Sequence, residues 1–186
     1  MTSELPDDPI LSELACYNSA KRPDAFLDIF TERGGQTLSE KALRFWPLVA
    51  EAWSGFDRIP HRDYGMFFKA YRLWWIADCM GPEARRLYDG LPPMITLYRG
   101  GDRQSGKGLS WTLDVETAKG FARGHRGLFN PNPTIFTARV RKSSVAFVCV
   151  DREESECVLF RPPRSFTMRD FTPHHGAGSR AGRNPA

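Results

Sequence analysis

The feature that most constrains the fold is a change of hydrophobic period near Met94. Two segments before it place aromatic and aliphatic side chains at helical spacing, at 38–54 and 63–80. Short alternating segments rich in β-forming residues follow it, at 94–100, 109–112, 134–140, 144–150 and 155–160. One helical pattern returns near 114–124. The sequence therefore predicts an α+β fold, in which an N-terminal helical region precedes a compact mixed β-sheet.

Capping and breaking residues predict where the helices begin and end. Asp63 and Asp114 are suitable N-caps for helices that follow them, and Gly81-Pro82 is a strong stop signal. Pro47 lies inside the first helical pattern, where it must bend or split the helix. We expect a short helix at 82–88.

Composition divides the chain into three parts: a helical region at 1–90, a β-rich core at 91–173 and a disordered basic tail at 174–186. The formal net charge is +4, and the five arginines and one aspartate from Arg161 onward account for all of it. The rest of the chain is balanced in charge, so nucleic-acid binding is not indicated.

The four cysteines are Cys16, Cys79, Cys149 and Cys157. None forms a CxxC pair or has a histidine at metal-ligand spacing, so we expect reduced thiols and no metal site. The N-terminus is acidic and lacks a secretory signal, and no apolar run is long enough to span a bilayer. These features predict a cytoplasmic protein without membrane partners, or one in the host cytosol if it belongs to a phage or a toxin.

Three short motifs lie on the predicted strands, in the order YRG at 98–100, SWT at 110–112 and ESE at 154–156. Each tripeptide alone has an ordinary structural explanation. As an ordered set, they resemble the arginine–serine–glutamate class of mono-ADP-ribosyltransferases, the cholera-toxin and clostridial-toxin type. The resemblance covers residues 94–160 and includes the helical pattern that follows SWT.

The resemblance implies an NAD site and a role for each motif residue. Arg99 would bind a phosphate or orient a ribose, because a guanidinium is a planar fork of donors. The backbone of Gly100 would contact the nicotinamide carboxamide. Ser110 would hold the glutamate and the ribose, and Thr112 would support the strand. Glu156 would stabilise the oxocarbenium-like transition state as the catalytic carboxylate.

Three further residues follow from the same resemblance. Glu154 is similar to the position that separates arginine-directed enzymes from others, and alternation places it on the same side as Glu156. Arg126 and Phe129 lie where the family carries a loop that contacts phosphate and nicotinamide. A plain surface loop explains those two equally well.

The implied function is transfer of ADP-ribose from NAD, the substrate and only cofactor, to a protein acceptor, an arginine side chain. Such a glycosyltransferase would suit a toxin or phage effector. Two alternatives keep the scaffold: an NAD glycohydrolase, and a catalytically inactive module that binds NAD or a protein. A third is an unrelated α+β interaction domain whose aromatic helices bind a partner.

Other polar and aromatic features receive structural interpretations. Four of the five tryptophans precede residue 90 and are expected in the core. The segment 105–108 (SGKG) lacks the spacing of a phosphate loop and is expected to be a turn. The histidines have no partner at recognisable spacing and are expected on the surface or in the tail: His61, His125, His174 and His175.

Overall fold

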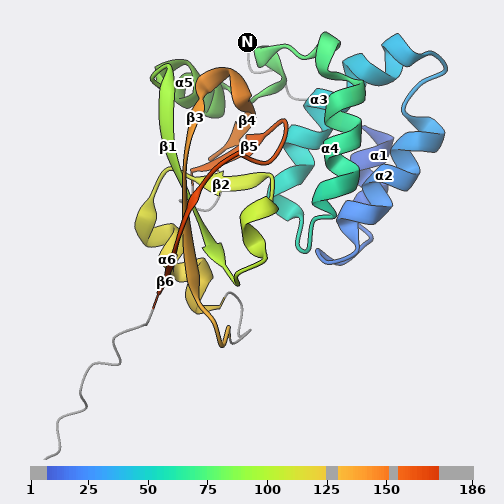
Figure 1. The fold of residues 1–186 in the computed structure, drawn as a ribbon. Helices are drawn as coiled ribbons and strands as arrows, with labels where there is room; N and C mark the ends of the chain where they lie inside the picture. The colour runs from blue at the N-terminus through green and yellow to red at the C-terminus, as the bar shows by residue number, and fades with distance from the viewer. Residues whose placement is uncertain (1–7, 125–129, 151–154, 172–186) are drawn as a thin grey trace, which may run out of the picture.

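Helices fill the N-terminal half of the chain and strands fill the C-terminal half. The structure, a computed structural model, describes residues 8–124, 130–150 and 155–171. Within them, six α-helices and a six-stranded sheet confirm the α+β prediction (Figure 1). The helices are α1 (Pro9–Leu14), α2 (Arg22–Arg33), α3 (Leu38–Ala52), α4 (His61–Ala70), α5 (Pro82–Gly90) and α6 (Val115–Arg123). The expected tail, 174–186, lies outside the described residues.

The sheet is antiparallel in every recorded ladder, so the prediction of a mixed sheet is wrong. Its strands are β1 (Met94–Gly101), β2 (Ser110–Thr112), β3 (Thr134–Arg141), β4 (Val145–Cys149), β5 (Glu156–Leu159) and β6 (Thr167–Asp170). They lie in the order β4-β5-β2-β1-β3-β6. The helical crossover through α6 does link two strands that run in the same direction, β2 and β3. Because β1 lies between them, no parallel ladder forms.

Helices cover both sides of the sheet. Figure 1 shows α1–α4 together on one side and α6 on the other. Two alanines of α6, Ala118 and Ala122, are fully buried and pack with Ile135 of β3. Gly100 on β1 permits this contact, because a Cβ atom there would lie 1.8 Å from the Ala118 carbonyl oxygen. The approach of α6 to the sheet therefore depends on a glycine at this position.

One hydrophobic core joins the N-terminal helices to the sheet. The indole rings of Trp46, Trp53 and Trp111 are each at most 2% exposed. Trp53, in a single 3-10 turn after α3, packs edge-on against Phe147 of β4, with ring centroids 5.5 Å apart. Edge-to-face packing of this kind stabilises aromatic pairs beyond their buried area. This packing fixes the position of the helical layer against the sheet.

The helix predicted at 63–80 is shorter than expected and begins earlier. Helix α4 starts after Pro60, so Asp63 is not its N-cap, and 3-10 turns follow at 72–74 and 77–79. Tertiary hydrogen bonds explain the early end. The Trp46 indole Nε1 donates to the Tyr71 carbonyl at 3.0 Å, and that of Trp75 donates to Ala146 of β4 at 2.6 Å.

Two expectations about the helices and one unexpected strand remain. Helix α3 runs through Pro47 without a break, so the proline does not split it. Asp114 caps α6 as predicted, accepting from the backbone N–H groups of Glu116 and Thr117 at 3.1 and 3.0 Å. Strand β6 was not expected. It pairs with β3 although its four residues are all exposed.

Candidate functional site

A cavity of about 330 Å³ lies between the N-terminal helical layer and the sheet. Five of the site residues predicted from the sequence are among the described residues, and all five line this cavity: Arg99, Gly100, Ser110, Thr112 and Glu156. The other three candidates lie outside the described residues: Glu154, Arg126 and Phe129. The helical layer contributes the opposite wall, which includes Trp53, Phe56 and His61.

The cavity lies where the sheet opens between β1 and β2. These strands share a single recorded pair, Tyr98 with Thr112, whereas β1 and β3 pair along their whole length. On the far side of β2, Thr112 pairs with Glu156 of β5. Tyr98, Thr112 and Glu156 therefore form one row across three strands, and all three line the cavity. The opening leaves backbone groups of β2 without a partner on β1.

Arg99 supplies one of the missing partners. Its Nη1 donates to the carbonyl of Ser110 on β2, and its Nε donates to the carbonyl of Ser105 at 2.7 Å. The guanidinium lies against Gly108, where a Cβ atom would be 2.4 Å from Arg99 Cζ. Burial lowers the pKa of Arg99 and the Glu156 carboxylate raises it. Since a guanidinium stays protonated in proteins, Arg99 is a fixed cation in the cavity wall.

His61 binds the backbone of Leu109, the residue just before β2, and the expectation that it is a surface histidine is wrong. Its Nδ1 accepts from the backbone N–H of Leu109 at 3.1 Å, and its Nε2 lies 3.3 Å from Nη2 of Arg99. Burial, together with the charge of Arg99, lowers the pKa of His61 to about 3. The imidazole is therefore neutral at physiological pH. No spacing in the sequence relates this first residue of α4 to β1.

Trp53 holds the carboxylate of Glu156. Its indole Nε1 lies 3.0 Å from Oε1 of Glu156 and 3.3 Å from Oγ of Ser110, so the N–H is shared between the two acceptors. The indole is only 1% exposed. The sequence predicted Trp53 as core alone, but it has both roles. Because 103 positions separate it from Glu156, no local pattern could reveal the contact.

Gly100 and Thr112 have structural roles besides their place in the cavity wall. Gly100 allows the close approach of α6 described above. The Thr112 hydroxyl accepts from the backbone N–H of Asp114 at 3.1 Å, which fixes the turn from β2 into α6. This contact places the start of α6 beside the cavity.

The site contains neither a recognisable metal centre nor a disulfide. Among the described residues, no three histidine, cysteine or acidic side chains form a group that could hold a metal ion. The four cysteines form no disulfide with one another, and Cys149 lines the cavity. Within the same described segments, no helix is long and apolar enough to cross a membrane.

The arrangement can bind a ligand that carries both positive and negative charge. Glu156 presents a carboxylate to the cavity, where it can stabilise a developing cation. Arg99 presents a guanidinium to the same space, where it can interact with an anion. Aromatic and glycine surfaces between them suit a flat ring: Trp53, Phe56, Tyr98, Gly100 and Phe121.

No protein-family model matches the chain, and neither curated proteins nor solved structures gave a match. The resemblance to ADP-ribosyltransferases thus depends on the three motifs and on the place of their residues in one cavity.

Proposed function

We propose that the protein is an NAD-dependent mono-ADP-ribosyltransferase that modifies an arginine side chain of a protein acceptor. The observation that carries the proposal is the meeting of Arg99, Ser110 and Glu156 in one cavity. They come from three separate strands and follow the order typical of the family. A carboxylate and a guanidinium in this setting suit the two charged parts of NAD, its nicotinamide ribosyl group and its diphosphate.

In the proposed reaction the bond between nicotinamide nitrogen and ribose C1′ breaks, and its electron pair leaves with nicotinamide. Positive charge develops at C1′, as in glycoside cleavage. Glu156 stabilises that charge, while the Trp53 N–H fixes one of its oxygens. A guanidine nitrogen of the acceptor then bonds to C1′ and releases a proton to water. Glu154, two positions before Glu156, would orient that incoming group.

Nicotinamide release by purified protein tests the first step. Glu156→Gln keeps the shape of the side chain but removes its full charge, so release should fall about 100- to 1000-fold. Glu154→Gln should largely spare release but reduce transfer to arginine, because the charge lost there acts on the acceptor. Equal loss of both activities in both variants would refute this division of roles.

Transfer is separated from hydrolysis by following the label. With NAD labelled in its adenosine half, a transferase leaves label on a macromolecule in a cell lysate. A glycohydrolase releases nicotinamide but labels nothing, and an inactive binding module does neither. Undiminished release by Glu156→Gln would remove Glu156 as the catalytic residue and overturn the proposal.

A further inference from the structure

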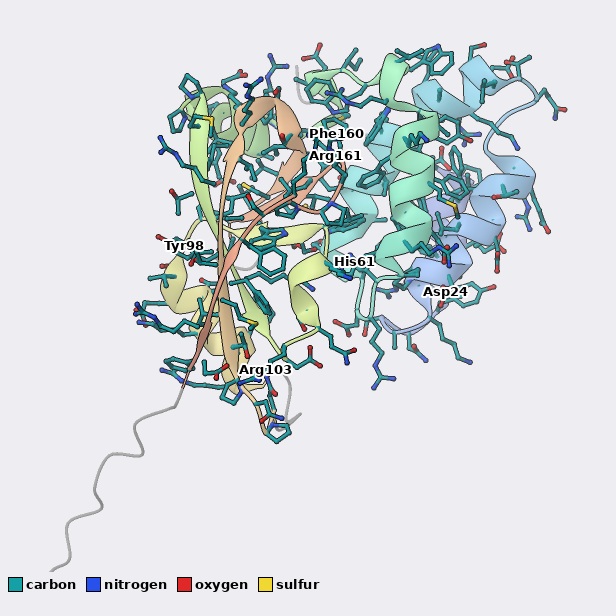
Figure 2. The ribbon with its side chains drawn as sticks, viewed as in Figure 1. Asp24, His61, Tyr98, Arg103, Phe160 and Arg161 are labelled. Carbon is teal, nitrogen blue, oxygen red and sulfur yellow. The ribbon has the colours of Figure 1, made fainter. Side chains whose placement is uncertain are left out.

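A second and wider hollow, of about 700 Å³, adjoins the cavity. His61 and Arg99 line both spaces, so the two are contiguous. Four cationic side chains line the second hollow and not the cavity, and we call it the basic groove after them: Arg62, Lys69, Lys107 and Arg161. They come from α4, from the connection between β1 and β2, and from the segment after β5. In Figure 2, the labelled His61 and Arg161 both lie on the side of the sheet that faces the N-terminal helices.

The protein does not neutralise the charge of these four cations. All four side chains are exposed, and none forms a salt bridge within the part of the chain that the structure describes. Asp102 is the one acidic residue in the lining, and its carboxylate accepts from the Gln104 backbone at 3.0 Å and from the Ser105 hydroxyl at 2.8 Å. A hollow lined by several exposed cations raises the local concentration of anionic ligands.

The rest of the lining favours a polypeptide over a nucleic acid as the anionic ligand. Grooves for single-stranded nucleic acids combine cations with aromatic side chains on which the bases stack. Among the described residues, no phenylalanine, tyrosine or tryptophan lines the basic groove. Its uncharged surface comes instead from Gly65, Met66 and Pro162, among others, and suits the backbone and aliphatic parts of a peptide. In a peptide, the groups that pair with arginine and lysine are the carboxylates of aspartate and glutamate.

Two of the cations set a spacing for such carboxylates. Arg62 and Lys69 are seven positions apart on α4, so they lie on the same face of the helix, about 10 Å apart along its axis. An extended chain covers that distance in about three residues. Acidic side chains about three positions apart in a peptide therefore match the two cations.

We propose that the basic groove binds an acidic segment of the protein acceptor, next to the arginine that enters the cavity. This inference rests on the proposed function, which supplies the acceptor and its arginine. For that arginine to reach Glu156, the residues beside it in the acceptor must cross the rim of the cavity. The basic groove adjoins the cavity, and its cations pair with carboxylates in those flanking residues. The groove thus selects arginines by the acidity of their neighbours.

Fluorescence anisotropy with two labelled peptides tests this inference without catalysis. The acidic peptide carries one arginine between two runs of four glutamates, and the neutral peptide carries glutamines in their place. Wild type should bind the acidic peptide more tightly, and this preference should shrink as salt is added. The test variant combines Arg62→Gln with Lys69→Gln, and the loss of two exposed ion pairs should weaken binding of the acidic peptide about 2- to 30-fold. The matched control, Arg139→Gln with Arg141→Gln, is exposed on β3 outside the groove and should match wild type.

Transfer kinetics give a second readout of the same groove. With the acidic peptide as acceptor, the KM for the peptide should rise in the test variant by the factor seen in binding. Arginine amide has no flanking residues to place in the groove, so its KM as an acceptor should not follow that rise.

The outcomes separate this inference from the proposed function. Selective binding of the acidic peptide, weakened in the test variant of a protein that releases no nicotinamide, supports a docking site for an acidic segment and overturns the function. Equal binding of the two peptides by a protein that does release nicotinamide overturns the inference and leaves the function standing. Two other results also overturn the inference. Tighter binding of a single-stranded oligonucleotide than of the acidic peptide, weakened by the same variant, would assign the groove to nucleic acid. A higher KM for NAD in the test variant, with unchanged peptide binding, would assign it to the dinucleotide.

Discussion

The hydrogen bond from Trp53 to Glu156 leads to the most informative prediction. Trp53→Phe keeps an aromatic ring against Phe147 but removes the N–H that lies 3.0 Å from the carboxylate. Without that donor, Glu156 loses its fixed orientation in the cavity, where the proposed reaction would place the ribose. We therefore expect a fall in kcat for nicotinamide release, with little change in the KM for NAD.

The size of the effect follows from the charge of the acceptor. A hydrogen bond to a charged group contributes about 1.5–3 kcal/mol. If the contact acts fully in the transition state, its loss lowers the rate about 10- to 150-fold, since ~1.4 kcal/mol corresponds to a factor of ten. Sharing of the N–H with Ser110 at 3.3 Å favours the lower part of this range.

Trp46→Phe is the matched control. Trp46 is as buried as Trp53, and its indole N–H also makes a 3.0 Å hydrogen bond, but to the carbonyl of Tyr71 and away from the cavity. Both variants should lose roughly 1–3 kcal/mol of unfolding free energy in urea titrations. Only Trp53→Phe should lose turnover beyond that explained by unfolded protein.

Equal losses of turnover by the two variants, after correction for stability, would mean that Trp53 acts through packing alone and would contradict the prediction. A higher KM for NAD with an unchanged kcat in Trp53→Phe would contradict it as well. That result would make the indole a surface for substrate binding rather than a positioning residue for Glu156.

Two further predictions concern Gly100 and His61. Gly100→Ala should destabilise the protein by about 1–3 kcal/mol or more, because the new Cβ on β1 would meet the backbone of α6. Gly120→Ala is the control on α6 itself, where the new Cβ would lie in open space, and it should stabilise the protein by up to about 1 kcal/mol. Thermal melts that rank the two variants in the opposite order would contradict this packing. His61 has a pKa of about 3 in the fold against an ordinary 6.5, so the unfolded chain binds the extra proton and wild type should lose stability as pH falls from about 6.5 toward 3. His61→Asn can still accept from Leu109 but does not titrate, so its melting temperature should depend less on pH over that range, and identical pH profiles would count against the assignment.

The sequence predicted the elements that local pattern encodes. The change of period near Met94 located the boundary between helices and sheet, and Asp114 located the start of α6. The sequence did not predict strand β6, because all four of its side chains are exposed and it lacks an alternation of buried and exposed residues. Backbone pairing with β3 at the edge of the sheet holds this strand in place. The end of α4 depends on hydrogen bonds to distant indoles, which no window of neighbouring residues contains.

The candidate site also contains some residues that a local sequence pattern predicts and others that it does not. Arg99, Ser110 and Glu156 stand out because each lies in a short motif on a predicted strand, and the structure places all three in one cavity. Trp53 and His61 carry no motif. The sequence predicts Trp53 only as a core residue and His61 only as a surface residue. The side chains that they contact, Glu156 and Arg99, lie 103 and 38 positions away in the chain.

The 103 positions between Trp53 and Glu156 also bear on the order of folding. The helical layer leaves the ribosome long before β5 is made, with indole and phenyl rings that have no sheet to cover them. Contacts between such distant residues form late and slowly, and the exposed rings favour aggregation until they form. The proposed activity should therefore appear only with the final docking step, so nicotinamide release, if the proposal holds, would report on complete folding.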